Sequence, residues 1–150
     1  MKRYAFALCL LTCIASGGFC QSAAFVDALL DSGSITVGQG AYLALAASGA
    51  IPENADVGLA FAELEKLGWV PRSAAAGTSI SLKDYSYIVM RALGLPGGFM
   101  YALLPGPRYA YRQLVYARVI QGRSDPGMLV PGAVALGMIG RALDMKGATE

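Results

Sequence analysis

The sequence contains no histidine, and its three cysteines, Cys9, Cys13 and Cys20, all lie at its N-terminal end. Histidine is the commonest general acid or base and the commonest metal ligand in proteins, so both kinds of chemistry lose their usual residue. If the N-terminal segment is removed, the remaining chain also has no thiol for a disulfide, a nucleophile or a metal site. We therefore expect a non-catalytic protein with no cofactor and no metal.

The carboxylates and the glycines offer no replacement for the missing histidine. Glu63 and Glu65 are too close in sequence to share one helical face. Asp84 and Asp125 are expected at a helix start and in a loop, where capping and turn roles explain them. No glycine-rich segment has the preceding strand that a phosphate-binding loop requires.

Charge is also scarce and nearly balanced, with 12 basic and 10 acidic residues. The net charge of +2 is contributed by Lys2 and Arg3, so the rest of the chain is close to neutral. This argues against general nucleic-acid binding, which depends on neutralising phosphates. Four arginines nonetheless lie in one C-terminal stretch, opposed nearby only by Asp125: Arg108, Arg112, Arg118 and Arg123.

The N-terminal segment has the layout of a signal peptide. Lys2 and Arg3 are followed by an apolar run at residues 4–15 and by the small residues "ASGG". The run is shorter than the roughly 20 residues that span a bilayer. We expect residues 1–22 to direct export to the periplasm or cell surface and to be removed. A lipid anchor at Cys20, or at Cys13, is the alternative.

Three segments, 34–50, 79–95 and 129–144, are predicted to be helices of similar sequence. Aligning Ile35 with Ile80, an offset of 45, brings Gly49 onto Gly94. Aligning Ile80 with Val130, an offset of 50, brings "RAL" at 91–93 onto "RAL" at 141–143. The second of these helices is apolar nearly all round, which is typical of a helix at the centre of a bundle.

The segments before the second and third of these helices also match. Residues 59–71 and 109–121 share an apolar stripe at helical spacing, again at an offset of 50. Each copy would therefore pair a leading helix with a second helix, and residues 24–34 would lead a shorter first copy. We predict one all-α domain, 23–150, with repeats at about 24–50, 55–95 and 109–144. Chance similarity of alanine-rich helices is the alternative.

The helix ends carry recognisable capping residues. Two second helices begin with a hydroxyl and a partner three residues later, as in a capping box: Thr36 with Gln39, and Ser81 with Asp84. Pro131 replaces the cap in the third copy, where its missing N–H is tolerated. Gly49 and Gly94 stand where a helix ends in a left-handed residue.

The stretch "YAYRQLVYARVIQGRSDPGMLVPGAVALGMIGRAL", 109–143, resembles one motif of the S-layer homology (SLH) domain. That motif has a leading helix, a Gly-Asp loop, a second helix opened by "ITRAE", and a "RALG" end. Residues 59–95 are similar to another motif, and residues 34–49 to the back half of a third. The resemblance implies a pseudo-threefold bundle with the three second helices at its centre. It also implies attachment to cell-wall polysaccharide linked to peptidoglycan.

The chain departs from the family at the basic residue of "TRAE", which contacts ligand in the family. Val37, Leu82 and Gly132 stand at that position here. The threonine is kept as Thr36 and as Ser81, which the resemblance places at the ligand site.

We predict that other ligand contacts come from the third copy: Arg108, Tyr109, Tyr111, Arg112, Arg123 and Asp125. Guanidinium groups suit carboxylate or phosphate oxygens, and aromatic rings offer flat apolar faces to sugars. The alternative is that the arginines are solvated and the tyrosines are half-buried helix residues.

Residues 96–107, "PGGFMYALLPGP", read as a loop because glycine and proline stand at both ends. We expect this apolar connector to fold back over the helices. The alternative is an exposed apolar patch for a partner or a membrane surface.

Two functions remain open from the sequence. The first is an exported, non-catalytic module of the cell envelope that binds cell-wall polysaccharide or peptidoglycan. The second is a structural subunit of a periplasmic or surface complex, with envelope proteins as partners and the saccharide site lost. Nucleic acid is not an expected partner of either.

Overall fold

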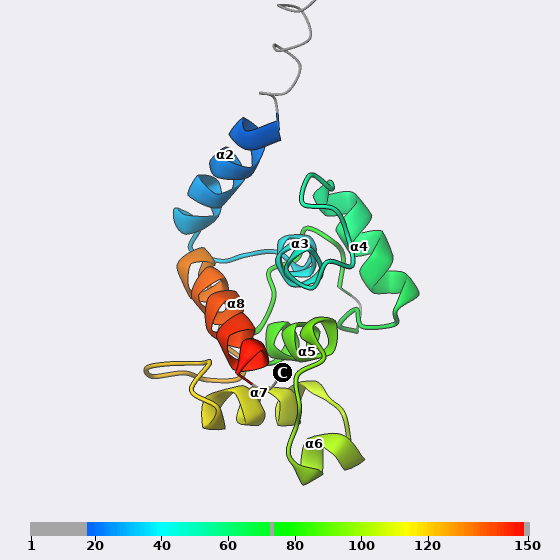
Figure 1. Ribbon diagram of the computed structural model, residues 1–150, viewed down its shortest axis with the longest axis vertical. Coiled ribbons are helices and arrows are strands. Elements are labelled where there is room, and N and C mark those ends of the chain that lie inside the picture. Colours follow the sequence, from blue (N-terminus) through cyan, green and yellow to red (C-terminus); the bar gives the residue numbers. More distant parts are fainter. Residues whose placement is uncertain (1–17, 73, 149–150) are drawn as a thin grey trace, which may run out of the picture.

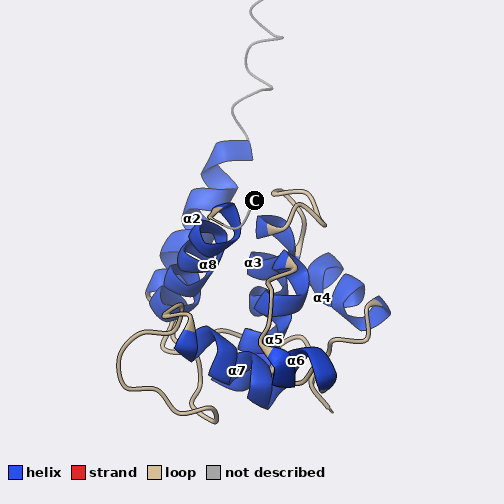
Figure 2. Cartoon of the chain, turned by 60° about the horizontal axis from the view of Figure 1, so that its bottom comes forward, coloured by secondary structure: helices blue, strands red, loops and turns tan. Residues whose placement is uncertain are grey.

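The computed structural model describes residues 18–72 and 74–148, and this part of the chain forms helices and loops without a strand (Figures 1 and 2). The predicted all-α class is confirmed. The helices are α2 (Gly18–Leu30), α3 (Val37–Ala47), α4 (Val57–Lys66), α5 (Leu82–Leu93), α6 (Phe99–Leu103), α7 (Pro107–Tyr116) and α8 (Gly132–Gly147). Residues 1–17 of the predicted signal peptide lie outside the described residues.

The three predicted second helices, α3, α5 and α8, contact one another in all three pairs. Each begins two residues after one of the aligned positions Ile35, Ile80 and Val130. Their apolar residues, including Leu45, Val89 and Ile139, belong to a single hydrophobic core. One bundle therefore buries residues from all three segments.

A closed ring of backbone hydrogen bonds joins the three aligned residues. The Ile35 amide donates to the Val130 carbonyl at 2.8 Å, the Val130 amide to the Ile80 carbonyl at 3.3 Å, and the Ile80 amide to the Ile35 carbonyl at 3.0 Å. All three side chains are at most 1% exposed. Because these backbone groups are buried, the ring satisfies polar atoms that would otherwise be costly to remove from water.

A second set of backbone hydrogen bonds, two residues later, joins the same three segments in the opposite circular order. The amide at each helix start donates to a carbonyl in the segment before another second helix: Val37 to Thr78 at 2.8 Å, Leu82 to Met128 at 2.8 Å, and Gly132 to Ser32 at 3.2 Å. Amides in the first turn of a helix have no partner within the helix. The neighbouring segment supplies that partner in each case.

The predicted leading helices pack in the same cyclic order as the ring of hydrogen bonds. Helix α4 packs against α3, α7 packs against α5, and α2 packs against α8 (Figure 1). Each predicted leading helix thus covers a second helix that the sequence alignment assigns to another predicted copy. The contact between α2 and α8 brings the first and last described helices together and closes the bundle.

Tyr85 fills the centre where α3, α5 and α8 meet. Its side chain is fully buried, and its hydroxyl donates to the Ala135 carbonyl at 3.1 Å. A Cβ atom at Gly40 would lie 3.1 Å from the Tyr85 ring. Gly40, Tyr85 and Ala135 each lie five residues after an aligned position, so two small residues make room for one large one. Burial raises the pKa of the Tyr85 phenol far above its usual value, so the group stays neutral.

The start of α8 approaches the end of α2 so closely that only glycine fits. A Cβ atom at Gly132 would lie 1.7 Å from the Leu29 carbonyl oxygen and 2.8 Å from Ser32 Oγ. A backbone oxygen cannot move aside as a flexible side chain can. The absence of a side chain at Gly132 is therefore a condition for the contact between α2 and α8.

The predicted helix ends are confirmed except at Ser81. Thr36 and Gln39 form the expected capping box, with bonds of 3.2 and 2.9 Å. The capping box predicted at Ser81 is wrong, since its hydroxyl donates to the Asp84 carboxylate and caps no backbone amide. A charged carboxylate is a stronger hydrogen-bond acceptor than a neutral oxygen, so the Ser81 hydroxyl donates to the Asp84 side chain. The backbone φ angles of Gly49 and Gly94 are +75° and +63°, as predicted.

Candidate functional site

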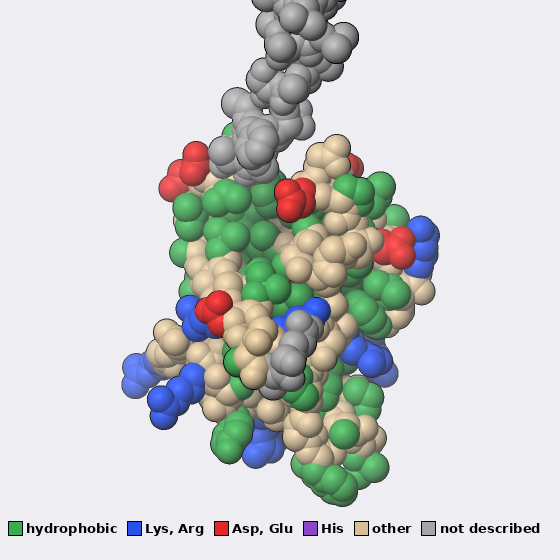
Figure 3. Space-filling model, in the orientation of Figure 1, with side chains coloured by type: hydrophobic (Ala, Val, Ile, Leu, Met, Phe, Trp, Pro, Cys, Tyr) green, Lys and Arg blue, Asp and Glu red, His purple; other side chains and the backbone are tan. Residues whose placement is uncertain are grey.

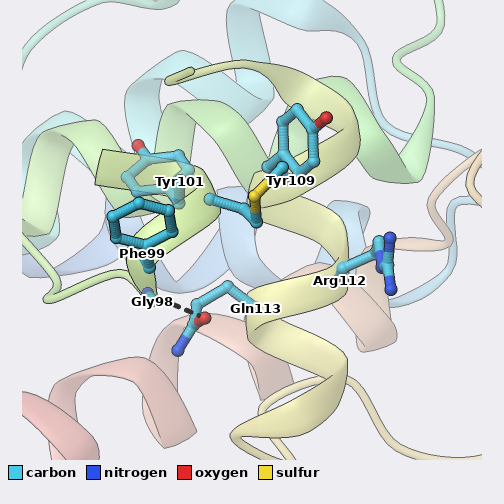
Figure 4. A pocket seen from close by; sticks show the side chains of 7 residues that line it. Gly98, Phe99, Tyr101, Tyr109, Arg112 and Gln113 are labelled. Carbon is cyan, nitrogen blue, oxygen red and sulfur yellow. Dashed lines mark hydrogen bonds between the residues drawn. The ribbon is translucent and has the colours of Figure 1, made fainter. Parts of the chain in front are cut away.

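A pocket of about 250 Å³ lies between α6 and α7 (Figure 4). It is lined by Gly98, Phe99, Met100, Tyr101, Tyr109, Arg112 and Gln113. The Gly98 amide donates to Gln113 Oε1 at 3.0 Å, which holds the start of α6 against α7. This bond connects the two elements that form the walls.

The sequence of α7 determines which side chains reach the pocket. Pro107 occupies the first turn, where its fixed φ angle favours a helix. Ala110 and Leu114, four residues apart, are buried and lie on the core side. Tyr109, Arg112 and Gln113 consequently lie on the side that faces α6.

Aromatic rings and hydrogen-bond donors share this pocket. Phe99 and Tyr101 come from α6, whereas Tyr109, Arg112 and Gln113 come from α7 (Figure 4). Because Gln113 Oε1 already accepts from Gly98, its amide NH₂ and the exposed Arg112 guanidinium are the polar groups offered to a ligand. Such a pocket can place a flat ring against aromatic faces and bind its oxygens.

The Tyr101 hydroxyl is buried and has no hydrogen-bond partner among the described residues. Burial raises the pKa of Tyr101, although the positive charge of Arg91 partly opposes this change. Arg91 and Tyr87, whose charges act on this hydroxyl, belong to α5, so Tyr101 turns its ring to the pocket and its hydroxyl away from it (Figure 4). An unpaired buried hydroxyl is uncommon in proteins.

The structure brings together two of the predicted site residues, Tyr109 and Arg112. Arg108 is exposed and does not line the pocket. Tyr111 lies elsewhere, with its hydroxyl 2.9 Å from Ser124 Oγ and 3.2 Å from the Ser124 carbonyl oxygen. It thus fixes the loop that follows α7.

The remaining predicted residues also lie outside the pocket. Arg123 and Asp125 are exposed in the loop after α7, and the Asp125 carboxylate accepts from the Gly127 amide at 2.7 Å, as in a turn. Thr36 and Ser81 lie at the starts of α3 and α5, where their hydroxyls already have the partners described above. These residues therefore do not form one site with Tyr109 and Arg112.

The position of the SLH family's basic residue lies inside the bundle here. Val37 and Leu82 are each 1% exposed, and Gly132 is buried against α2. A residue in the first turn of these helices faces the neighbouring segment, to which its amide is bonded. No side chain at this position reaches a ligand at the surface.

The favoured expectation that segment 96–107 folds back over the helices is wrong for most of its apolar residues. Phe99 is 79% exposed, Met100 47%, Leu103 62% and Leu104 54%. Only Tyr101 of α6 packs against the core. A five-residue helix between glycine- and proline-containing turns contributes one side chain to the core and leaves the others in solvent.

Sequence reasoning missed the pocket residues Gly98 and Gln113 and the role of the ring of Tyr101. The apolar composition of 96–107 was a signal for Phe99 and Tyr101. Nothing in the sequence distinguishes Gln113, a common surface residue, until its bond to Gly98 is seen.

Arg91 and Arg141, which share the "RAL" motif, both have structural partners. The Arg91 guanidinium lies 5.8 Å from the ring centre of Trp69 and donates to the Tyr87 hydroxyl at 3.2 Å. Arg141 donates to the Val119 carbonyl at 2.7 Å. Trp69 and Val119 are 50 residues apart, as are the two arginines. Arg91 therefore joins α5 to the segment after α4, and Arg141 joins α8 to the segment after α7.

Comparisons with family models, with curated proteins and with solved structures find no match to this chain. None of the helices in the described ranges combines the length and the apolar character needed to cross a membrane. The described residues also contain no group of three or more acidic or cysteine side chains placed to hold a metal ion.

Proposed function

We propose that this chain is an exported, non-catalytic module of the cell envelope, with an SLH-like fold, that binds cell-wall polymer in the pocket between α6 and α7. One observation carries this proposal. Tyr109 and Arg112, which the sequence indicated as ligand-binding residues, line a common pocket with two further aromatic rings.

The circular order of the contacts supports the resemblance to the SLH domain. The ring through Ile35, Ile80 and Val130 relates the three copies at the residues that the sequence offsets align. The exchange of leading helices follows the same order. A pseudo-threefold bundle accounts for both features, and SLH motifs assemble into such a bundle.

The chemistry of the pocket suits an acidic or phosphorylated saccharide. Phe99, Tyr101 and Tyr109 offer flat apolar faces to sugar rings, and the Arg112 guanidinium donates to carboxylate or phosphate oxygens. The residues that line the pocket include no Asp or Glu. Because hydrolysis of a glycoside ordinarily needs two carboxyl groups, this favours binding over cleavage.

Sedimentation with purified sacculi tests the proposed function. We expect the protein to pellet with sacculi that carry their attached polysaccharide, and to do so less with sacculi stripped of it. Tyr109→Ala with Arg112→Ala should weaken this binding about tenfold or more, because an aromatic face and a charged donor are both lost.

Tyr116→Ala with Arg72→Ala is the matched control, since both residues are exposed and lie outside the pocket. It should bind as the parent does, and circular dichroism should show both double variants folded. Unchanged binding of the folded Tyr109/Arg112 variant would contradict the assignment of the site.

A second candidate function is a structural subunit of an envelope complex without a saccharide site. The burial of Val37, Leu82 and Gly132, where the SLH family has its basic residue, favours this candidate. Failure of the parent protein to pellet with either kind of sacculus, together with a stable envelope protein partner, would support it.

A further inference from the structure

An apolar tip projects from the bundle at α6. We define the α6 tip as Phe99, Met100, Leu103 and Leu104, all of which are exposed. Among the described helices, the backbone of α6 approaches only α7, and no residue of α6 is buried. The tip forms the lower end of the molecule in Figure 1, where Figure 3 shows a hydrophobic surface.

The stretch of sequence that contains the α6 tip carries charge of one sign. Residues 85–124 contain five arginines and no Asp or Glu, whereas residues 24–84 contain seven Asp or Glu and three Lys or Arg. Arg108, Arg112 and Arg118, on and just after α7, are exposed. Most of the Asp and Glu side chains visible in Figure 3 lie in the half of the molecule opposite α6.

We propose that the α6 tip inserts into the surface of an anionic lipid bilayer, with the neighbouring arginines bound to lipid headgroups. A bilayer of this kind presents an apolar interior beneath a plane of negative charge. The exposed apolar side chains of the tip, followed four residues later by Arg108, match these two layers. The tip matches the apolar interior of the bilayer, and the positive arginines match its negative surface.

Other occupants fit the α6 tip less well. A wall polymer is polar and offers no apolar interior to Leu103 and Leu104. A second copy of the chain could supply acidic residues, but four side chains fall far short of the roughly 800 Å² per partner that a stable interface buries. A fluid bilayer needs no matching recess, so a small projecting tip is sufficient.

Vesicle flotation of the full chain tests this proposal. Leu103→Ser with Leu104→Ser should lower partitioning onto vesicles of phosphatidylglycerol and phosphatidylcholine about tenfold or more, because two leucines no longer enter the apolar layer. Leu59→Ser with Leu67→Ser is the matched control, since these leucines are 51% and 40% exposed and lie on the acidic part of the chain. It should bind as the parent does. The N-terminal segment is common to all variants, so differences among them report on the tip.

The charge dependence forms a second arm of the same experiment. Arg108→Gln with Arg118→Gln should weaken binding to the anionic vesicles about fivefold per arginine, and added salt should reduce binding by the parent. Arg72→Gln, an exposed arginine outside the acid-free stretch, should have little effect. Equal binding of the parent to anionic and to pure phosphatidylcholine vesicles would overturn the role of the arginines.

The tip assignment is overturned if the Leu103/Leu104 variant binds vesicles as well as its control does. It is also overturned if sedimentation without lipid shows self-association that this variant abolishes, because the tip would then be a contact between copies. Binding to lipid-free sacculi involves Tyr109 and Arg112 and should persist in the leucine variant. The membrane proposal and the proposed wall-binding function can therefore fail independently.

Discussion

Gly132→Ala is expected to lower the free energy of unfolding by about 3 kcal/mol or more, a large effect for a single added methyl group. The new Cβ atom would lie 1.7 Å from the Leu29 carbonyl oxygen, so α8 and α2 must separate. Their separation would also lengthen the bond from the Gly132 amide to the Ser32 carbonyl. Urea unfolding followed by circular dichroism measures the change.

Gly140→Ala is the control for this prediction, because it makes the same substitution in the same helix. A Cβ atom at Gly140 meets nothing within 4 Å. Alanine in a helix interior is favoured over glycine, so this variant should gain about 0.5–1 kcal/mol. If Gly132→Ala were as stable as the parent, the close contact between α2 and α8 would be wrong.

Tyr85→Ala is expected to lower the free energy of unfolding by about 3–5 kcal/mol. Among the described residues Tyr85 is the largest fully buried side chain, and α3, α5 and α8 all contribute to the site that it fills. Its removal leaves a cavity at the centre of the bundle that Gly40 and Ala135 are too small to fill. Tyr85→Phe keeps the ring and loses only the bond to the Ala135 carbonyl, so it should cost about 1 kcal/mol.

Tyr116→Ala provides the comparison, since Tyr116 is 85% exposed at the end of α7. Its removal should change the free energy of unfolding by no more than about 0.5 kcal/mol. An equally small effect of Tyr85→Ala would mean that the three helices do not meet around this residue.

Local patterns made the helices other than α6, and the ring residues, predictable; residues 96–107 were predicted to be a loop, whereas Phe99–Leu103 form α6. Apolar spacing identifies a helix from its own segment, and the offsets of 45 and 50 aligned Ile35, Ile80 and Val130, which the structure joins by hydrogen bonds. The exchange of leading helices was not predictable in this way. A leading helix could cover the second helix of its own copy or of another, and the choice depends on contacts far apart in the sequence.

The role of Gly132 could not be predicted from the sequence for the same reason. In the sequence it is a departure from the SLH pattern, where a basic residue is missing. In the structure it is the only residue type that allows α8 to approach the Leu29 carbonyl. The distance between two backbones cannot be deduced from either segment alone.

The site was predicted in part for similar reasons. Tyr109 and Tyr111 look equivalent in the sequence, but two residues rotate a side chain by about 200° around a helix. Tyr109 therefore faces α6, whereas Tyr111 bonds to Ser124 on another side. The second wall of the pocket comes from α6, whose position depends on the turns around it and on the bond from Gly98 to Gln113.

The arrangement of the three second helices depends on the closed ring of backbone hydrogen bonds through Ile35, Ile80 and Val130. The same ring supports the resemblance to the SLH domain. Native-state hydrogen exchange of these three amides, followed by NMR, tests it most directly. If the ring is closed, all three amides exchange only when the whole domain unfolds, with the same free energy. Rapid exchange of Ile35 by local opening, while Ile80 and Val130 stay protected, would show that the first copy does not close the ring and would contradict the arrangement.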